Sequence, residues 1–329
     1  MLKLNSLSGF GSGAAGGAGG VVKGYFQGGQ KDSGNTDKCE KLTFATGVMV
    51  ANSDGDLSRA PEGPLGVSDS TLYGYTVAGD AGDRTGSDRM TYATDTAAAD
   101  TDSDFTQNQV GGGTLNDGGT AYSYSVGGYY AGRVDDCHRL THSSGTWAAH
   151  TDGDLPYVAN GLGGCTLSDA VSGVGSAVYG YVTGGYTAAA VDTSIRFTFS
   201  TSSSALHTDS DFATGSARGF TAAHCGPLAG YQTGGSHLHN STDKITWATS
   251  VSSTSTDMDG TAEGGNRNNP DGLGDNTTYG YQTGGYQSPV YIDKTERMTY
   301  ATDAYALHTD ADLQVDAKGD GSTFSLGGV

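Results

Sequence analysis

The sequence has few basic residues, few cysteines and no long apolar run. Lys and Arg number 17 against 36 acidic residues, which gives a formal net charge of -19. A charge of this sign repels nucleic acid and anionic membrane surfaces. Four cysteines are too few for a disulfide scaffold in 329 residues. No run of about 18 apolar residues is present to cross a membrane as a helix. We therefore expect neither a nucleic-acid partner nor membrane insertion.

Glycine and tyrosine are abundant instead, with 55 and 19 residues. The glycines follow no G-X-Y period, which excludes collagen, and the many aromatic residues argue against disorder. Runs of Tyr, Thr and Val between Gly, Asp, Asn and Ser predict β-strands, and no segment has a helical period. Residues 1–20 lack the continuous apolar core of a secretory signal. They are typical of a short apolar arm with a flexible linker, which we expect to mediate assembly.

Residues 21–329 contain six copies of one repeat of about fifty residues, each with three signatures in the same order. The first is Tyr-x-x-Gly-Gly, with Ala-Gly in the second copy, and starts at Tyr25, Tyr75, Tyr124, Tyr181, Tyr231 and Tyr281. The second is basic-apolar-Thr-aromatic, with His142 replacing the aromatic in the third copy, and starts at Lys41, Arg89, Arg139, Arg196, Lys244 and Arg297. The third, ten residues after the second ends, is Asp-x-Asp, and starts at Asp54, Asp102, Asp152, Asp209, Asp257 and Asp310. An apolar residue follows it in all copies except the fifth, which has Gly260.

An all-β repeat of this length accommodates four short strands, which is one blade of a β-propeller. We therefore predict an all-β, six-bladed propeller of four-stranded blades over residues 21–329. The first copy lacks a clear first strand, whereas the C-terminal tail resembles one. We expect residues 322–329 to supply the innermost strand of the first blade and so to remove both free edges. The alternative is that Phe324 opens an incomplete seventh blade.

These signatures resemble the kelch repeat. They are most similar to the kelch-like variant of bacteriophage virion proteins, in which GYxxGG precedes a basic-apolar-Thr-aromatic-Ala-Thr strand and an acidic turn. The matching stretches TFAT, TYAT, TWAT and TYAT start at Thr43, Thr91, Thr246 and Thr299. The resemblance covers about residues 21–329, and it implies a component of the virion, such as a tail, fibre or capsid decoration protein.

The repeated charges predict ion pairs, because both faces of a blade pack against neighbours and a buried basic side chain needs a partner. We expect Lys41, Arg89, Arg139, Arg196, Lys244 and Arg297 to pair with Asp54, Asp102, Asp152, Asp209, Asp257 and Asp310. An alternative for the acidic motif is calcium binding, with Asp54, Asp56, Asp152 and Asp154 as candidate ligands. We expect no other cofactor or metal.

A placed set of catalytic side chains is not evident. His150, His207 and His308 share one position in different repeats, so they cannot converge on one metal ion. His224 and Cys225 are a possible fragment of a reactive site, without a placed third group. Candidate surface residues for recognition are tyrosines, whose alternative role is packing between blades: Tyr129, Tyr130, Tyr186, Tyr286 and Tyr291.

The favoured interpretation is a non-enzymatic structural or adhesive protein at the surface of a virion. Its expected partners are other virion subunits, contacted through residues 1–20, and a host-surface glycan or protein. The alternative is a secreted glycan-active propeller enzyme or a calcium-dependent carbohydrate-binding module. Such proteins need clustered carboxylates or a metal at one end of the propeller channel.

Overall fold

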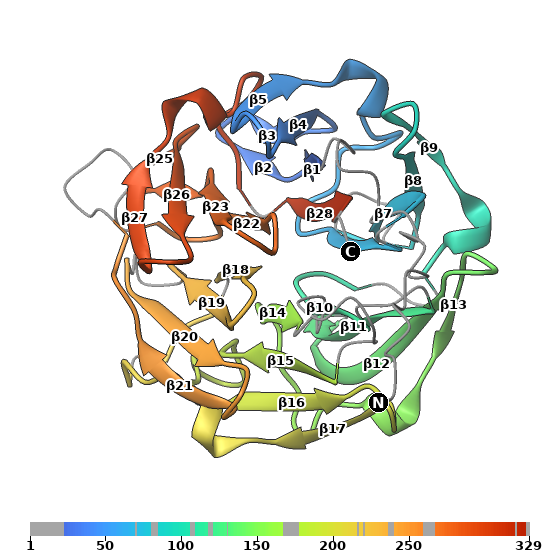
Figure 1. Cartoon of the computed structure of the whole chain (residues 1–329). Helices are drawn as coiled ribbons and strands as arrows, with labels where there is room; N and C mark the ends of the chain where they lie inside the picture. The colour runs from blue at the N-terminus through green and yellow to red at the C-terminus, as the bar shows by residue number, and fades with distance from the viewer. Residues whose placement is uncertain are drawn as a thin grey trace, which may run out of the picture.

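Six four-stranded antiparallel sheets stand around a common axis in the computed structural model (Figure 1). It describes residues 23–69, 71–79, 85–105, 109–117, 121–129, 131–166, 178–215, 217–219, 221–235, 240–258, 267–319 and 321–326. The predicted six-bladed propeller is therefore confirmed. No helix in these ranges is long and apolar enough to cross a bilayer.

Each blade is a meander whose strands run in order from the axis to the rim. Blade 1 consists of β28 (Ser322–Leu326), β1 (Lys23–Gln27), β4 (Cys39–Thr43) and β5 (Val48–Ala51). Blade 2 consists of β6 (Leu65–Ser68), β7 (Tyr73–Val77), β8 (Ser87–Thr91) and β9 (Thr96–Ala99). Blade 3 consists of β10 (Gly113–Asn116), β11 (Tyr122–Tyr129), β12 (Arg133–Thr141) and β13 (Thr146–Ala149). Blade 4 consists of β14 (Gly163–Thr166), β15 (Tyr179–Thr183), β16 (Ser194–Thr198) and β17 (Ser203–Leu206). Blade 5 consists of β18 (Ala222–Cys225), β19 (Ala229–Thr233), β20 (Thr242–Thr246) and β21 (Val251–Thr254). Blade 6 consists of β22 (Asp271–Gly274), β23 (Tyr279–Thr283), β26 (Thr295–Thr299) and β27 (Ala304–Leu307).

Two short ribbons extend the hairpins between the second and third strands. They are β2 (Gln30–Lys31) with β3 (Gly34–Asn35) in blade 1, and β24 (Tyr286–Gln287) with β25 (Val290–Tyr291) in blade 6. These hairpins and the connections between successive blades lie at the same end of the ring. The other end carries the turns between first and second strands and between third and fourth strands.

The C-terminal strand closes the ring. β28 pairs with β1 in an antiparallel register that sets Phe324 opposite Tyr25 and Ser322 opposite Gln27. β28 also lies against the inner strands β6 and β22 of the two neighbouring blades. The closure prediction is confirmed, and Phe324 belongs to the first blade rather than to a seventh.

Aromatic stacking between neighbouring blades explains two of the repeat signatures. The motif tyrosine lies at the centre of the second strand and is at most 2% exposed in all six blades. The aromatic that ends the third strand of the next blade packs against it, as Tyr92 does on Tyr25 at 5.7 Å between ring centroids. Trp247 on Tyr181 and Tyr300 on Tyr231 repeat the arrangement. The core therefore lies between blades, so each blade is stabilised mainly by its neighbours.

The second glycine of each Gly-Gly pair joins its blade to the connection that leads into the next one. Its N–H donates to a backbone carbonyl four residues before the next inner strand, as Gly29 does to Pro61 O at 3.1 Å. Gly29 has φ +102°, and a Cβ there would lie 2.6 Å from Gly319 O. A side chain is excluded there on both counts. The same bond is made by Gly79, Gly128, Gly185, Gly235 and Gly285.

The Asp-x-Asp motif forms a 3₁₀ turn after the fourth strand in blades 1, 2, 3, 4 and 6: η1 (Ser53–Gly55), η2 (Thr101–Ser103), η3 (Thr151–Gly153), η5 (Thr208–Ser210) and η6 (Thr309–Ala311). The second Asp accepts the N–H that begins the third strand, for example Cys39 N to Asp56 at 2.9 Å. Such side-chain to backbone bonds are typical of Asp in turns.

In the fifth repeat, the segment from the start of the third strand to the capping Asp is two residues shorter than in the other repeats. Asp257 takes the place of the second Asp and accepts the Thr242 N–H at 3.2 Å. Met258, which is 2% exposed, fills the apolar position that Leu57 occupies in blade 1. The prediction that the fifth copy lacks this apolar residue was therefore wrong.

Candidate functional site

The basic residues of the third strands have other partners than the predicted Asp-x-Asp carboxylates. Lys41 pairs with Asp95 (Nζ–Oδ2 2.9 Å) and Lys244 with Asp303 (2.7 Å), and both acids lie in the turn between third and fourth strands of the next blade. The four arginines each cover a tyrosine ring of their own blade, 4.3 to 4.7 Å from its centroid: Arg89 on Tyr73, Arg139 on Tyr122, Arg196 on Tyr179 and Arg297 on Tyr279.

The predicted ion pairs were wrong, because the basic side chains contact other groups. Lys41 and Lys244 reach the end with the turns between third and fourth strands. Arg89 comes nearest to the prediction, since its Nη1 lies 3.1 Å from Asp100, which directly precedes the Asp-x-Asp turn of its own blade. The Asp-x-Asp turns lie at the end with the connections between blades. There the first acid is exposed in five repeats: Asp54, Asp102, Asp152, Asp209 and Asp310. The corresponding prediction for Asp257 fails because this residue caps the third strand.

The arrangement varies with one turn residue in each blade. Where this residue has a polar side chain, the motif tyrosine of the preceding blade contacts it, as Tyr25 donates to Asp95 at 2.5 Å and Tyr181 to Ser250 at 2.5 Å. Where this residue is Asp, the preceding blade has a Lys. Where it is Ser or Gly, the preceding blade has an Arg stacked on a Tyr. The six turn residues in blade order are Gly47, Asp95, Gly145, Ser202, Ser250 and Asp303.

Asp95 carries the densest of these junctions. It accepts hydrogen bonds from Lys23 (2.7 Å), Tyr25 (2.5 Å) and Lys41 (2.9 Å). Burial by itself would raise the pKa of Asp95, but these three hydrogen bonds outweigh it and lower the pKa to about 2. The carboxylate is therefore ionised at neutral pH and holds blades 1 and 2 together.

Two of the three histidines of the shared position also join neighbouring blades. The Nε2 of His150 donates to Ser202 O at 3.0 Å, and that of His308 donates to Gly47 O at 2.9 Å. Asn52 makes the equivalent bond to Asp95 O at 2.9 Å. These side chains therefore have a structural role at the junctions between blades.

His224 lies on the inner strand β18, buried between blades 5 and 6. Its imidazole stacks on Tyr231, with 5.3 Å between centroids, and its Nε2 lies 2.8 Å from the Tyr305 hydroxyl. Tyr300 lies 3.3 Å from Nδ1 and donates its hydroxyl to Cys225 O, so Nδ1 is the donor and Nε2 the acceptor. Burial lowers the pKa of His224 to about 3, which keeps the ring neutral.

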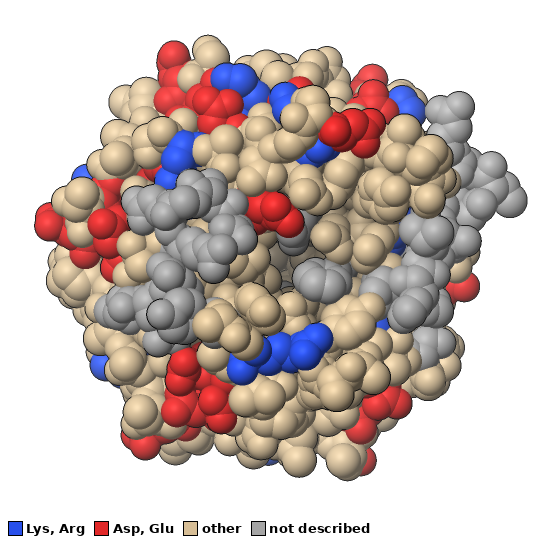
Figure 2. Space-filling view, turned by 180° about the vertical axis from the view of Figure 1, so that it is seen from behind, with Lys and Arg blue, Asp and Glu red and all other residues tan. Residues whose placement is uncertain are grey.

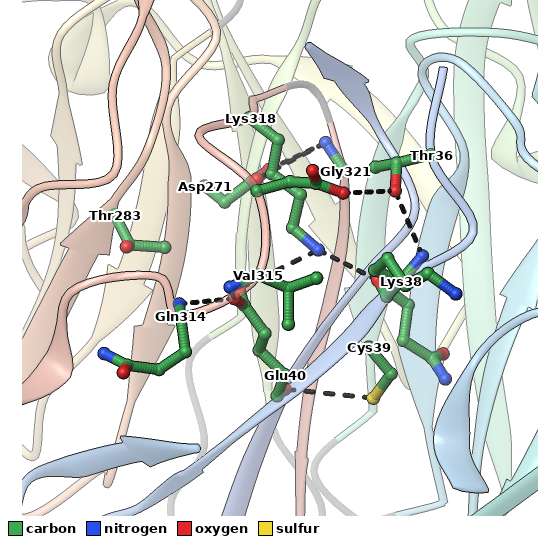
Figure 3. Close-up of polar contacts among 12 residues, drawn as sticks. Thr36, Lys38, Cys39, Glu40, Asp271, Thr283, Gln314, Val315, Lys318 and Gly321 are labelled. Carbon is green, nitrogen blue, oxygen red and sulfur yellow. Dashed lines mark hydrogen bonds and ion pairs between the residues drawn. The ribbon is translucent and has the colours of Figure 1, made fainter. Parts of the chain in front are cut away.

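Three buried ion pairs hold the connections into blades 5, 6 and 1. They are Arg218–Asp243, Arg267–Glu296 and Lys318–Glu40, with side chains at most 2% exposed. Figure 3 shows the third: Glu40 accepts N–H groups of Gln314 (2.6 Å) and Val315 (2.7 Å), and Lys318 donates to Lys38 O (2.9 Å). This pair therefore fixes the connection that leads from blade 6 into blade 1.

A cavity lies on the axis, where the inner strands begin. The space-filling view shows the molecule hollowed at its centre (Figure 2), and the volume of the cavity there is about 130 Å³. Its lining is mainly Gly, Pro, Thr, Ala and Leu, and Asp271 is the one charged side chain among the described residues that line it. Asp271 is 7% exposed and accepts the Gly321 N–H at 3.1 Å (Figure 3).

Asp271 is specific to blade 6. The strand registers place uncharged residues at the same position in the other blades: Ser322, Leu65, Gly113, Gly163 and Ala222. Asp271 was not predicted as a site residue, because the first strands share only small residues. The signal would have been one acid in a set of inner strands that otherwise carry no charge.

Two uncharged polar side chains border the same cavity. Thr221 is 9% exposed, and its Oγ1 is buried with no hydrogen-bond partner in the described part of the chain. Asn269 Oδ1 is likewise buried without a partner within those residues, and Asn269 has φ +51°. Unpaired buried oxygens cost free energy of folding. A ligand that forms hydrogen bonds with these two oxygens would therefore gain binding free energy.

Three of the five predicted recognition tyrosines lie beside the segments that line this cavity. Each forms an isolated β-bridge with the residue directly before a cavity-lining residue. The bridges join Tyr129 to Val110, Tyr186 to Asn160 and Tyr286 to Asn268, and the lining residues are Gly111, Gly161 and Asn269. The backbones of tyrosines from blades 3, 4 and 6 thus lie at the same end of the ring as the cavity.

These tyrosines differ in accessibility. Tyr129 is 45% exposed, whereas Tyr186 and Tyr286 are half-buried. Tyr291 packs edge-on against Tyr286, with 5.3 Å between centroids, and its hydroxyl donates to Gln30 of blade 1. Tyr130 lies outside the described residues. Tyr129 is therefore the most open recognition residue, and Tyr286 and Tyr291 also serve packing.

The candidate calcium ligands divide into two kinds. Asp56 and Asp154 cap the backbone N–H groups of Cys39 (2.9 Å) and Cys137 (2.7 Å), whereas Asp54 and Asp152 are exposed. Within the described ranges no group of three or more His, Cys, Asp or Glu suited to a metal ion occurs. Calcium binding at these turns stays a prediction.

No protein-family model matches the chain, and a search of curated proteins finds no match. The fold class is therefore defined by the structure, as a six-bladed β-propeller.

Proposed function

We propose that this propeller is a non-enzymatic structural and adhesive protein. We place it in a bacteriophage virion, as a tail, fibre or capsid decoration component that binds a host surface. The supporting observation is how the residues are used. The motif tyrosines and the pairs Lys41–Asp95 and Lys244–Asp303 join neighbouring blades. At one end of the ring, Tyr129, Tyr186 and Tyr286 lie beside the segments that line a polar cavity.

Such an arrangement suits recognition for physical reasons. A ring held together by junctions between all its blades keeps the surrounding loops in fixed relative positions, which lowers the entropic cost of binding. Tyrosine supplies a large contact area with few rotatable bonds and a hydroxyl at its tip. The net charge of -19 favours neutral or basic partners over acidic ones.

The first experiment tests the location. Antibodies against the propeller are used to label purified phage particles in electron micrographs. We expect labels at one defined part of the particle, and tryptic peptides of the chain in the particle proteome. Their absence from particles whose other structural proteins are detected would refute the virion assignment.

The second experiment tests adhesion with Tyr129→Ala. Fluorescent protein is titrated onto host cells, and we expect binding to weaken about tenfold or more if Tyr129 is a main contact. Leu228→Ser is the matched control, because Leu228 is 72% exposed and precedes β19, at the other end of the ring. Equal binding by both variants would contradict the proposed surface.

Assembly through residues 1–20 is part of the proposal, although these residues lie outside the described ranges. A chain that begins at residue 21 should still bind cells but fail to join particles in an in vitro assembly reaction. Incorporation of the shortened chain at the normal level would refute this role.

A glycan-active enzyme remains the second candidate, because the carboxylate of Asp271 lies inside the cavity. Release of reducing ends from host polysaccharide, abolished by Asp271→Asn, would favour the enzyme. A calcium-dependent carbohydrate-binding module would instead lose its binding in the presence of EDTA.

A further inference from the structure

We infer that the axial cavity binds one neutral or amino-bearing sugar residue, held through adjacent hydroxyl groups by Asp271, Asn269 and Thr221. This inference rests on the proposed function, since it names the ligand class of the same end of the ring. It concerns the cavity rather than the tyrosines around it.

The cavity wall carries a set of hydrogen-bonding groups that matches adjacent sugar hydroxyls. Asp271 offers carboxylate oxygens, and the Asn269 amide both accepts and donates hydrogen bonds, as does the Thr221 hydroxyl. Asp271 and Asn269 are separated by one residue at the start of β22, and Thr221 directly precedes the neighbouring inner strand β18. Adjacent sugar hydroxyls present donors and acceptors side by side, which is the complementary pattern.

Two buried oxygens of the cavity wall also favour a ligand with hydroxyl groups. Thr221 Oγ1 and Asn269 Oδ1 are both buried without a hydrogen-bond partner among the described residues. A buried polar atom without a partner costs about 1–3 kcal/mol. A ligand hydroxyl that reaches these atoms removes this cost, so a polyhydroxyl ligand is favoured over an apolar one.

The size and charge of the cavity restrict the ligand further. Its volume of about 130 Å³ is several times the roughly 10–15 Å³ that one water molecule needs, so a small polar ligand fits. Gly321 leaves room beside Asp271, because a Cβ there would lie 3.2 Å from Asp271 Oδ2. A carboxylate in the wall repels acidic sugars and attracts an ammonium group. Neutral and amino sugars are therefore expected, and uronic and sialic acids are not.

The experiment uses the whole chain and four probes: methyl glucoside, N-acetylglucosamine, glucosamine and glucuronic acid. Binding is followed by saturation-transfer NMR and titration calorimetry at up to tens of millimolar. Thr221→Val is the key variant, because it removes only the unpartnered hydroxyl and keeps the side-chain shape. We expect it to weaken binding about tenfold at an unchanged or higher Tm.

Asp271→Asn should also weaken binding, most strongly for glucosamine, whereas Asp310→Asn in an exposed turn should leave it unchanged. The inference is overturned if no probe binds the folded protein, if Thr221→Val binds as the original chain does, or if EDTA abolishes binding. Cell binding separates the two proposals. Adhesion that depends on Tyr129 without sugar binding refutes only this inference, and sugar binding without adhesion refutes only the proposed function.

Discussion

Replacement of Asp95 by Asn should destabilise the propeller by an amount that the structure allows us to estimate. The pKa of Asp95 is about 2 in the folded protein, against an ordinary value of 3.8 for an aspartate side chain. The difference corresponds to about 2 kcal/mol of stability at neutral pH. Because the pKa is lowered by folding, this stability is present above pH 4 and is lost as the pH falls towards 2. Asn carries no charge, so Asp95→Asn should lose the same amount at pH 7.

Urea denaturation followed by tryptophan fluorescence measures the effect. The original chain, Asp95→Asn and the exposed control Asp310→Asn are compared at pH 7 and at pH 3. We expect Asp95→Asn to lose about 2 kcal/mol at pH 7 and Asp310→Asn less than about 0.5 kcal/mol. The difference between the original chain and Asp95→Asn should shrink at pH 3. Equal stability of the two variants at pH 7 would refute the reasoning.

A triple variant tests the rule that links the blades. Lys23→Tyr, Lys41→Arg and Asp95→Ser together convert the junction between blades 1 and 2 into the type found between blades 3 and 4. There Arg139 covers Tyr122, and Tyr124 lies 3.0 Å from Ser202 Oγ. We expect the triple variant to be more stable than Asp95→Ser alone. If it is not, the pairing of Lys with Asp between blades is coincidental.

Two further predictions concern buried charge. The imidazole pKa of His224 is about 3 in the folded protein, below its unfolded value, so between pH 6.5 and 3 only the unfolded chain takes up the proton and stability is lost. His224→Leu should remove this loss. Parallel curves of unfolding free energy against pH for the two proteins would contradict the prediction. Glu296→Gln should cost about 3–5 kcal/mol, because it leaves the buried Arg267 guanidinium without its carboxylate. The double replacement of both residues by Met should recover most of that loss, and denaturant midpoints that do not differ between single and double variants would contradict this.

The architecture could be predicted because the informative residues repeat. Tyr25 and its five equivalents occupy the same place in each blade, so their spacing reports the blade count directly. The closing strand was recognisable because Phe324 falls too soon after Leu313 to begin another copy. The fifth copy was misaligned, because Asp257 satisfies the Asp-x-Asp pattern while it actually caps Thr242 in a shorter loop.

The contacts between blades were harder to predict. Lys41 and Asp95 lie in different repeats, and sequence alone does not say which end of a blade a mid-strand side chain reaches. The cavity residues were missed for another reason. Asp271, Asn269 and Thr221 lie in inner strands and connections that share no motif, so their equivalence appears only when the strand register is known. The repeated residues therefore predict the propeller, whereas the candidate site consists of residues that differ between the repeats.

The pairing of β28 with β1 has a consequence for how the chain folds during synthesis. The ribosome makes β1 first among the described strands and β28 last, so blade 1 stays one strand short until translation has passed all the other blades. Until then the inner edge of β1 is open to pairing with other chains, which is a known route to aggregation. Loss of a few residues around Phe324 should therefore impair the yield of folded protein far more than its share of the contacts suggests.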